Sequence, residues 1–240
     1  MIQLYCDETL EVDARVLEQE AREKAAQEKS RLRSKASVIF QRASSKHALR
    51  DACTWAAVVL TAPLWLPVWL EAYLGRGEAV FTACSEFLSL FPGLPGVVLR
   101  RGFYRQTLDR FATDCHLGFL TTIAHREVEI AEGVYIGSRC TLGRVAIEAH
   151  VTIGSNVDLL SGRRQHGFAD SDVPVQQQGG TFEQIRIGCN SWLGNSSVVM
   201  ADVGALCVIG AGSVVVKPIA AGVVAVGNPA MPKRHRSYAA

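Results

Sequence analysis

One polar stretch, between Leu160 and Ile185, carries the side chains best suited to chemistry, and it contains one histidine, His166. Because imidazole titrates near neutral pH, a positioned histidine can withdraw a proton from an attacking hydroxyl or amine. Arg163 and Arg164 precede it, and guanidinium groups bind anionic substrates and phosphates. Both features also have a simpler interpretation, since a lone loop histidine and a basic loop face are often only solvated.

A base of this kind is commonly oriented by a carboxylate, and the sequence offers three aspartates for that role: Asp158, Asp170 and Asp172. Asp158 comes just before the polar stretch, on the side where regular structure would hold it in place. Asp170 and Asp172 lie within the stretch, where their charges could serve only to solvate a loop. Asp158 is therefore the first candidate, and the other two stay open.

The polar stretch interrupts a repeat of aliphatic residues that starts near Ile123. Large aliphatic residues recur mostly at six-residue intervals on both sides of it, at Ile130, Ile136, Leu142, Ile147, Ile153, Leu159, Ile187, Leu193, Val199, Ile209 and Val215. Such a period places successive positions on different faces of an α-helix, whereas residues two apart on a strand point to the same side. Most of them follow a smaller or β-branched residue by two positions, as Ile136 follows Val134. The repeat predicts short strands separated by corners, with glycines that permit tight bends.

The segments IGSRCTLG, IGSNVDLL, IGCNSWLG and VIGAGSVVVKPIAAGVVAVGNPAMPKR resemble the hexapeptide-repeat acyltransferases, over roughly residues 123–236. This resemblance implies a mainly β fold, a left-handed parallel β-helix in which three hexads wind into one triangular coil. We expect that domain at residues 111–225. The resemblance also implies acetyl-CoA as the acyl donor and a homotrimer with active sites between neighbouring subunits.

The resemblance assigns roles to particular residues. In the family a histidine that follows an interrupted coil and precedes an acidic and proline-containing stretch is the catalytic base, and HGFADSDVP takes that place here. His166 is therefore predicted to be the general base. Family members often have asparagine and tryptophan at comparable coil corners, so Asn156, Asn190 and Trp192 are predicted to bind substrate, together with Arg163 and Arg164.

The donor is expected along the later coils, because pantetheine is a thin chain that fits a groove of small residues and exposed amides. The residues predicted to bind it are Gly194, Ala211, Gly212, Ser213, Lys217, Lys233 and Arg234, the last two from a basic tail at residues 226–240. The glycines are also needed by the fold, and a basic tail is often only solvated. The segment MADVGALCVIG is shorter than a regular run of hexads, which leaves the register of the last coils open.

The N-terminal half has two parts of different composition. Residues 1–50 are rich in charged residues and alanine and predict a solvated helix. Residues 51–110 contain two apolar runs, 54–70 and 79–99, each interrupted by prolines, which favours broken or shallowly inserted helices that associate with a membrane. Basic residues at both outer ends would keep both ends on the cytoplasmic side: Arg42, Lys46 and Arg50 before the first run, and Arg100, Arg101 and Arg105 after the second. The alternative is a helical hairpin packed within the trimer, and in either case this half is expected to cover the open edge of the coil.

Composition sets further bounds. The 240 residues are 48% hydrophobic and 20% charged, which argues against disorder, and a net charge of +2 gives no reason to expect nucleic acid. The seven cysteines form no CxxC pair, so we expect reduced thiols rather than a disulfide framework or a zinc cluster. The first ten residues do not show the basic residues followed by an apolar stretch that begin a secretory signal, which favours a cytoplasmic location.

These features predict an acetyltransferase that acts on a hydroxyl of a saccharide or lipid-linked saccharide, in exopolysaccharide or surface-glycan assembly, at the cytoplasmic face of the inner membrane. Two alternatives stay open: a soluble small acceptor such as serine or an antibiotic, and a β-helix scaffold without activity. The γ-class carbonic anhydrases share the prism but need three histidines on a metal. Here His125, His150 and His166 lack the close spacing of such ligands, so no metal is expected.

Overall fold

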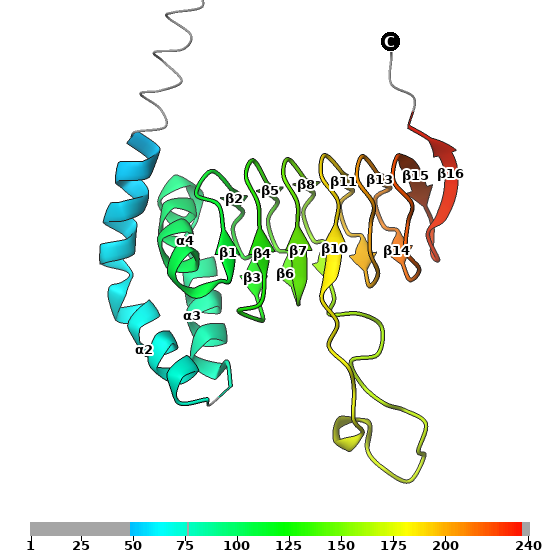
Figure 1. The fold of residues 1–240 in the computed structure, drawn as a ribbon, viewed down its shortest axis with the longest axis horizontal. Helices are drawn as coiled ribbons and strands as arrows, with labels where there is room; N and C mark the ends of the chain where they lie inside the picture. Colours follow the sequence, from blue (N-terminus) through cyan, green and yellow to red (C-terminus); the bar gives the residue numbers. More distant parts are fainter. Residues whose placement is uncertain (1–48, 76, 237–240) are drawn as a thin grey trace, which may run out of the picture. The chain divides into compact units, whose positions relative to one another are not determined.

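The computed structural model describes residues 49–75 and 77–236. The chain divides into two units, residues 1–50 and 51–240, and the charged helix predicted in the first unit lies outside the described residues apart from its last two positions. The second unit joins a group of helices to a coil of short strands (Figure 1). The predicted fold class, a β-helix of hexapeptide repeats with a helical N-terminal region, is confirmed.

The coil has three faces, each a sheet of parallel strands. Face A contains β1 (Arg110–Phe111), β4 (Glu129–Ile130), β7 (Val145–Ile147) and β10 (Ile185–Ile187). Face B contains β2 (His116–Leu117), β5 (Tyr135–Ile136), β8 (Thr152–Ile153), β11 (Trp192–Leu193), β13 (Val208–Ile209) and β15 (Val223–Val226). Face C contains β3 (Thr122–Ile123), β6 (Thr141–Leu142), β9 (Asp158–Leu159), β12 (Val198–Val199) and β14 (Val214–Val215). The last strand, β16 (Met231–His235), pairs antiparallel with β15, so part of the expected basic tail belongs to the sheet.

The interior of the prism is built from the residues that the repeat predicts. Ile130, Ile136 and Leu142 of one coil are fully buried, and they lie in register with the aliphatic residues of the next coil. The smaller residues two positions earlier, such as Val134 and Cys140, are buried as well. Each short strand therefore contributes inward side chains that stack in layers, and this apolar burial is the main stabilising contribution to the coil.

Two of the three corners bend through one residue in the left-handed conformation. At the corner between faces B and C these residues include Arg139 and Asn156, with φ of 59° and 57°. The glycine two positions earlier, such as Gly137, does not adopt a positive φ. A Cβ on Gly137 would lie 2.7 Å from the carbonyl carbon of Gly154 in the next coil. The glycines that follow the large residues thus permit close stacking of coils, which corrects the expectation that they make the bend.

The corner between faces C and A takes up all differences in coil length. Its connections are residues 124–128, 143–144, 160–184, 200–202 and 216–218. The polar stretch and the shortened segment are therefore a long and a short version of the same corner. After the shortened segment, Val203 bridges Ile187 and Ile219 on face A, and Ile209 pairs with Leu193 on face B. The register that the sequence left open is regular to the last coil.

The helices cover the first coil. A helical segment at Leu49–Leu60 is followed by α2 (Ala62–Tyr73), α3 (Ala79–Ser89) and α4 (Gly93–Thr107), and the last three pack against one another. α3 contacts β3, and α4 contacts β1 and β2, as expected for a cap on an open coil edge. We call these helices the helical cap.

A buried arginine ties the helical cap to the coil. Arg100 is fully buried, and its guanidinium donates hydrogen bonds to the carbonyls of Leu88 and Phe91, both at 2.9 Å, and to that of Leu117 at 3.0 Å. Arg101 donates through Nε to the Cys115 carbonyl at 2.6 Å. These two arginines therefore serve the fold and do not form the basic flank that the sequence suggested after the second apolar run.

Neither apolar run forms one straight helix. Among the described residues no single helix is long and apolar enough to cross a membrane. The helices Leu49–Leu60 and Ala62–Tyr73, which meet at a bend of 67°, are long and apolar enough only when they are taken together. The second run is divided between α3 and the start of α4. Pro63 lies in the first turn of α2 and Pro92 directly precedes α4, where proline starts a helix without loss of a hydrogen bond.

Candidate functional site

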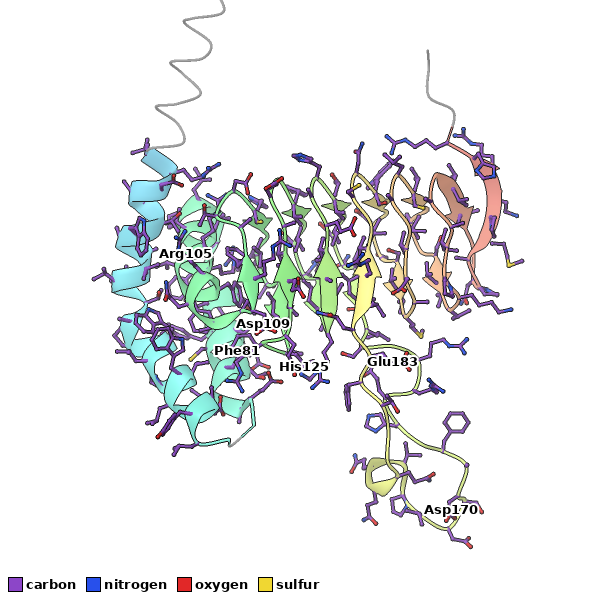
Figure 2. All side chains as sticks on the ribbon, in the orientation of Figure 1. Phe81, Arg105, Asp109, His125, Asp170 and Glu183 are labelled. Carbon is purple, nitrogen blue, oxygen red and sulfur yellow. The ribbon has the colours of Figure 1, made fainter. Side chains whose placement is uncertain are left out.

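The polar stretch leaves the prism at the corner between faces C and A as an excursion of residues 160–184, with Glu183 at its base and Asp170 at its far end (Figure 2). Its two arms are joined near the prism. The Glu183 amide donates to the Ser161 carbonyl at 3.0 Å, and the Thr181 amide donates to the Arg164 carbonyl at 2.6 Å. We call these paired arms the neck. Because they continue from β9 and β10, the coil positions the neck.

His166 lies in the neck with an exposed side chain. The opposite arm approaches it closely at Gly180, where any Cβ would collide with the Gln165 carbonyl and lie 2.8 Å from the His166 amide nitrogen. Glycine at this position lets the two arms close at the histidine. Within residues 49–75 and 77–236 no group forms a hydrogen bond with the His166 imidazole. The ring is accessible to a group from outside the chain.

The three candidate carboxylates lie at two different places. Asp158 is on face C, in β9. Asp170 and Asp172 lie farther out on the excursion, where the Asp172 amide donates to Asp170 Oδ1 at 2.9 Å. The Gln178 side chain donates to the Asp170 carbonyl at 2.7 Å and helps to hold that end together. In the part of the chain that the structure describes, none of the three carboxylates forms a hydrogen bond with His166, and their roles stay predictions.

A pocket of about 460 Å³ opens at the base of the neck, against the next two connections of the same corner. Its lining includes three basic and two acidic residues: Arg163, Arg164, Lys217, Glu183 and Asp202. Arg163 Nη1 donates to the Val216 carbonyl at 3.0 Å, which ties the neck to a later coil, and Arg164 forms an ion pair of 2.7 Å with Glu183. The fold thus brings Lys217 to the same hollow as Arg163 and Arg164, which lie more than 50 residues earlier in the sequence.

The residues predicted to bind substrate from the coil lie apart from the excursion. Asn156 is at the corner between faces B and C, where its Oδ1 accepts a hydrogen bond from Arg139 Nε at 2.8 Å. Asn190 is at the corner between faces A and B, with φ of 54°. Trp192 is in β11 on face B and is 54% exposed, so it is a strand residue rather than a corner residue. Within one chain these three residues do not converge on His166.

The small residues predicted to line the donor groove do share one corner. Gly194 is stacked directly on Ala211, since a Cβ on Gly194 would lie 2.8 Å from the Ala211 Cα. Ala211 and Gly212 are exposed at the corner between faces B and C, and Gly212 has a φ of 68°. Ser213 differs from them because it is buried and its Oγ accepts a hydrogen bond from the Gly227 amide at 3.1 Å. Its hydroxyl serves the fold.

The basic residues predicted to meet the donor's phosphates divide between two places. Lys217 lines the pocket at the neck, together with Arg163 and Arg164. Lys233 and Arg234 are exposed on β16, at the end of face B. The pocket was not predicted as one site, although the three residues that form its basic side were each singled out. Glu183 and Asp202 were missed, and the sequence signal for Glu183 is its position just before the repeat resumes at Ile185.

One histidine outside the excursion has a shifted pKa. His116 lies on face B, and its ring stacks on Tyr135 with 4.8 Å between ring centroids and 9° between planes. Burial lowers the pKa of His116, and the positive charges of Arg101 and Arg100 lower it further. The fold therefore favours the neutral imidazole at this position.

Glu78, His125 and Glu127 are the group among the described residues that could approach a metal ion, with all three ligand atoms within 4.8 Å of one another. Glu78 already accepts hydrogen bonds from His125 Nδ1 at 2.7 Å and from the Arg126 amide at 2.8 Å. Burial acts to raise the pKa of Glu78, but the hydrogen bonds from Arg126 and His125 outweigh it and lower the pKa. Glu127 pairs with Arg144 at 3.0 Å. We interpret this group as a polar junction between the helical cap and the coil.

Solved structures share this fold at low sequence identity. A maltose O-acetyltransferase from Clostridium difficile is 21% identical with a TM-score of 0.53, and the match covers 67% of this chain and 87% of that one. A hexapeptide-repeat-containing acetyltransferase from Vibrio cholerae is 18% identical with a TM-score of 0.51, over 65% of this chain and 91% of that one. No family model matches the sequence, and no curated protein matches it. The chain has the fold of the hexapeptide-repeat acetyltransferases.

Proposed function

We propose that this chain is a coenzyme A-dependent O-acetyltransferase that moves an acetyl group from acetyl-CoA to a hydroxyl of a saccharide. The observation that supports this most is the excursion, which presents the exposed imidazole of His166 next in the chain to the basic residues of the pocket. The fold shared with two acetyltransferases, one of them acting on maltose, adds to it. The rest of the prism has no comparable departure from the repeat among the described residues.

His166 acts as the general base in the proposed reaction. One ring nitrogen takes the proton of the acceptor hydroxyl while that oxygen attacks the thioester carbonyl, so a C–O bond forms and the carbonyl oxygen becomes negative. When the tetrahedral intermediate collapses, the C–S bond breaks and the imidazolium returns the proton to the leaving thiolate. The products are the acetyl ester and coenzyme A.

The complete site is proposed to lie between neighbouring copies of the chain in a homotrimer. Among residues 49–75 and 77–236 no carboxylate pairs with His166, and Asp158, Asn156, Asn190 and Trp192 lie on other parts of the prism. An excursion that projects from one prism can reach the face of a neighbour, which would supply the orienting and acceptor-binding groups. Arg163, Arg164 and Lys217 would bind phosphates of the donor or an anionic acceptor, and Gly194, Ala211 and Gly212 would line the pantetheine groove.

The acceptor is proposed to be a saccharide on a lipid carrier, as in exopolysaccharide or surface-glycan assembly. Acetyl-CoA as the donor would require the site to face the cytoplasm. The apolar surface of the helical cap supports an acceptor at a membrane, because a water-soluble acceptor such as serine gives no reason for such a surface.

The test is release of thiol from acetyl-CoA by the full-length protein in the presence of separate acceptors: sugar nucleotides, a lipid-linked saccharide, serine and an aminoglycoside. We expect turnover with a saccharide and a loss of about 10²–10⁴-fold in turnover for His166→Asn. His150→Asn is the matched control, because His150 is an exposed histidine at another corner and asparagine tolerates its φ of 59°.

Three outcomes would contradict the proposal. Full activity in His166→Asn would show that His166 is not the general base. Turnover with serine or the aminoglycoside and with no saccharide would show that the acceptor is not a saccharide. Absence of turnover with every acceptor, in a protein that unfolds cooperatively, would favour a scaffold without activity.

A further inference from the structure

The helical cap exposes a set of large apolar side chains from one stretch of sequence, which we call the helical apolar surface. Its members come from residues 52–74, and each is at least half exposed: Trp55, Val59, Leu60, Leu66, Trp69, Leu70, Tyr73 and Leu74. This segment contains one charged residue, Glu71, and that side chain is buried. A surface of this size without an exposed charge is unusual on a protein that faces only water.

Two polar side-chain groups beneath the helical apolar surface are already bound within the fold. The Glu71 carboxylate accepts hydrogen bonds from the Val80 amide at 2.8 Å and the Phe81 amide at 3.2 Å, at the start of α3. The indole of Trp69 donates to the Gln106 carbonyl at 2.7 Å. An indole or carboxylate that is satisfied internally needs no water, so this surface can leave water without leaving such a group unpaired.

The geometry of the segment favours a position along a membrane surface. The two helices meet at 67°, and Pro67 inside α2 removes the amide that would have bonded the carbonyl four residues earlier. A carbonyl without its helical donor is best placed where water or a lipid headgroup can reach it. Trp55, Trp69 and Tyr73 carry rings that favour the boundary between headgroups and acyl chains.

A basic side chain borders the same surface. Arg105 on α4 is exposed, and its guanidinium carbon lies 4.5 Å from the centroid of the Trp55 ring. The sequence places two further basic residues, Arg42 and Lys46, shortly before the first helical segment. Positive charge at the edge of an uncharged apolar surface is complementary to anionic headgroups that surround an apolar interior.

We propose that the helical apolar surface docks the protein on an anionic lipid bilayer, with the bent helix pair lying in the interfacial layer. Val59, Leu66 and Leu70 enter the acyl boundary, and Arg105 meets the headgroups. The proposal rests on the helical cap alone, so lipid binding and acyl transfer can fail independently of each other.

The test is flotation of the full-length protein with vesicles of phosphatidylcholine and phosphatidylglycerol at 3:1. We expect the wild type to float with the vesicles, and the triple variant Val59→Gln, Leu66→Gln, Leu70→Gln to partition about 100-fold less, since each change removes roughly 1 kcal/mol of apolar transfer. The matched control changes three exposed apolar residues elsewhere to glutamine, Phe168, Val175 and Met231, and should float like the wild type.

Further arms separate lipid from protein as the occupant. Vesicles of phosphatidylcholine alone should bind less protein, and equal binding would refute the role of Arg105 and the headgroup charge. A wild type that stays unbound, or a triple variant that floats as well as the control, would overturn the proposal. So would light scattering that shows the triple variant breaking up an oligomer while vesicles bind neither protein, because a second copy would then be the occupant. Circular dichroism of both variants checks that the helices are retained.

Discussion

The substitution Arg100→Met should destabilise the protein by separating the helical cap from the coil. In the wild type the guanidinium donates to the buried carbonyls of Leu88 and Leu117 and to the partly buried carbonyl of Phe91, and methionine can fill much of its volume but donate to none of them. Each carbonyl left unpaired destabilises the folded state by about 1–3 kcal/mol, while removal of a buried charge offsets part of that loss. We expect a net loss of about 2–4 kcal/mol, which for a chain of this size lowers the Tm by about 5–15 °C.

The assay is thermal and urea unfolding of the full chain, followed by circular dichroism. Arg105→Met is the matched control, because Arg105 is an exposed arginine on the same helix whose contact is the Trp55 ring. It should change the free energy of unfolding by no more than about 0.5–1 kcal/mol. Arg100→Lys should lie between the two, since an ammonium reaches fewer carbonyls than the guanidinium fork. If Arg100→Met unfolds at the same temperature as Arg105→Met, the reasoning about the buried carbonyls is wrong.

Three further predictions follow from single contacts. The pKa of His116 is lower in the folded protein than in the unfolded chain, so its contribution to stability is present above the unfolded pKa and decreases as the pH falls from 7 toward 5. The Tm of His116→Phe should therefore fall less over that pH range than the Tm of the wild type. Gly137→Ala should cost about 1–3 kcal/mol in urea unfolding because its Cβ would press on the next coil's backbone, whereas Gly179→Ala, with open space around it, should be neutral. Lys217→Ala should raise the KM for acetyl-CoA with little change in kcat; an unchanged KM would remove the pocket from donor binding.

The strands of the coil could be predicted because one physical constraint repeats. The large inward residue of each short strand is apolar and recurs at a nearly constant interval, so Ile136, Leu142 and Ile153 can be identified by their spacing alone. The excursion was predictable for the same reason, as the one long gap in that spacing. The role of Gly137 was not, because a glycine needed for positive φ and a glycine needed for close backbone stacking look identical in a sequence.

The arrangement of the candidate site was less accessible to sequence reasoning. Spacing in the sequence does not say which corner of a prism a residue occupies. Asn156 and Asn190 were therefore predicted to bind substrate together with Arg163 and Arg164, although they lie at the other two corners. The pocket joins Arg163 to Lys217 across two coils, a proximity that depends on the register of the shortened segment. The burial of Arg100 was also unexpected, since arginine beside an apolar run usually indicates a charged flank rather than a donor to interior carbonyls.

The corner that carries the excursion differs from the other two in its hydrogen bonds. At the corner between faces B and C, the left-handed residue of each coil donates to the coil before it, as the Asn156 amide does to the Ser138 carbonyl and the Ser196 amide to the Ser155 carbonyl, both at 2.9 Å. The corner between faces A and B has the same ladder, with the Asn190 amide donating to the Ala149 carbonyl at 3.0 Å. An insertion there would break a ladder that fixes the spacing of coils, whereas the corner between faces C and A varies in length with both neighbouring sheets intact. The physical cost of carrying His166 on a long excursion is therefore lowest at the corner where it occurs.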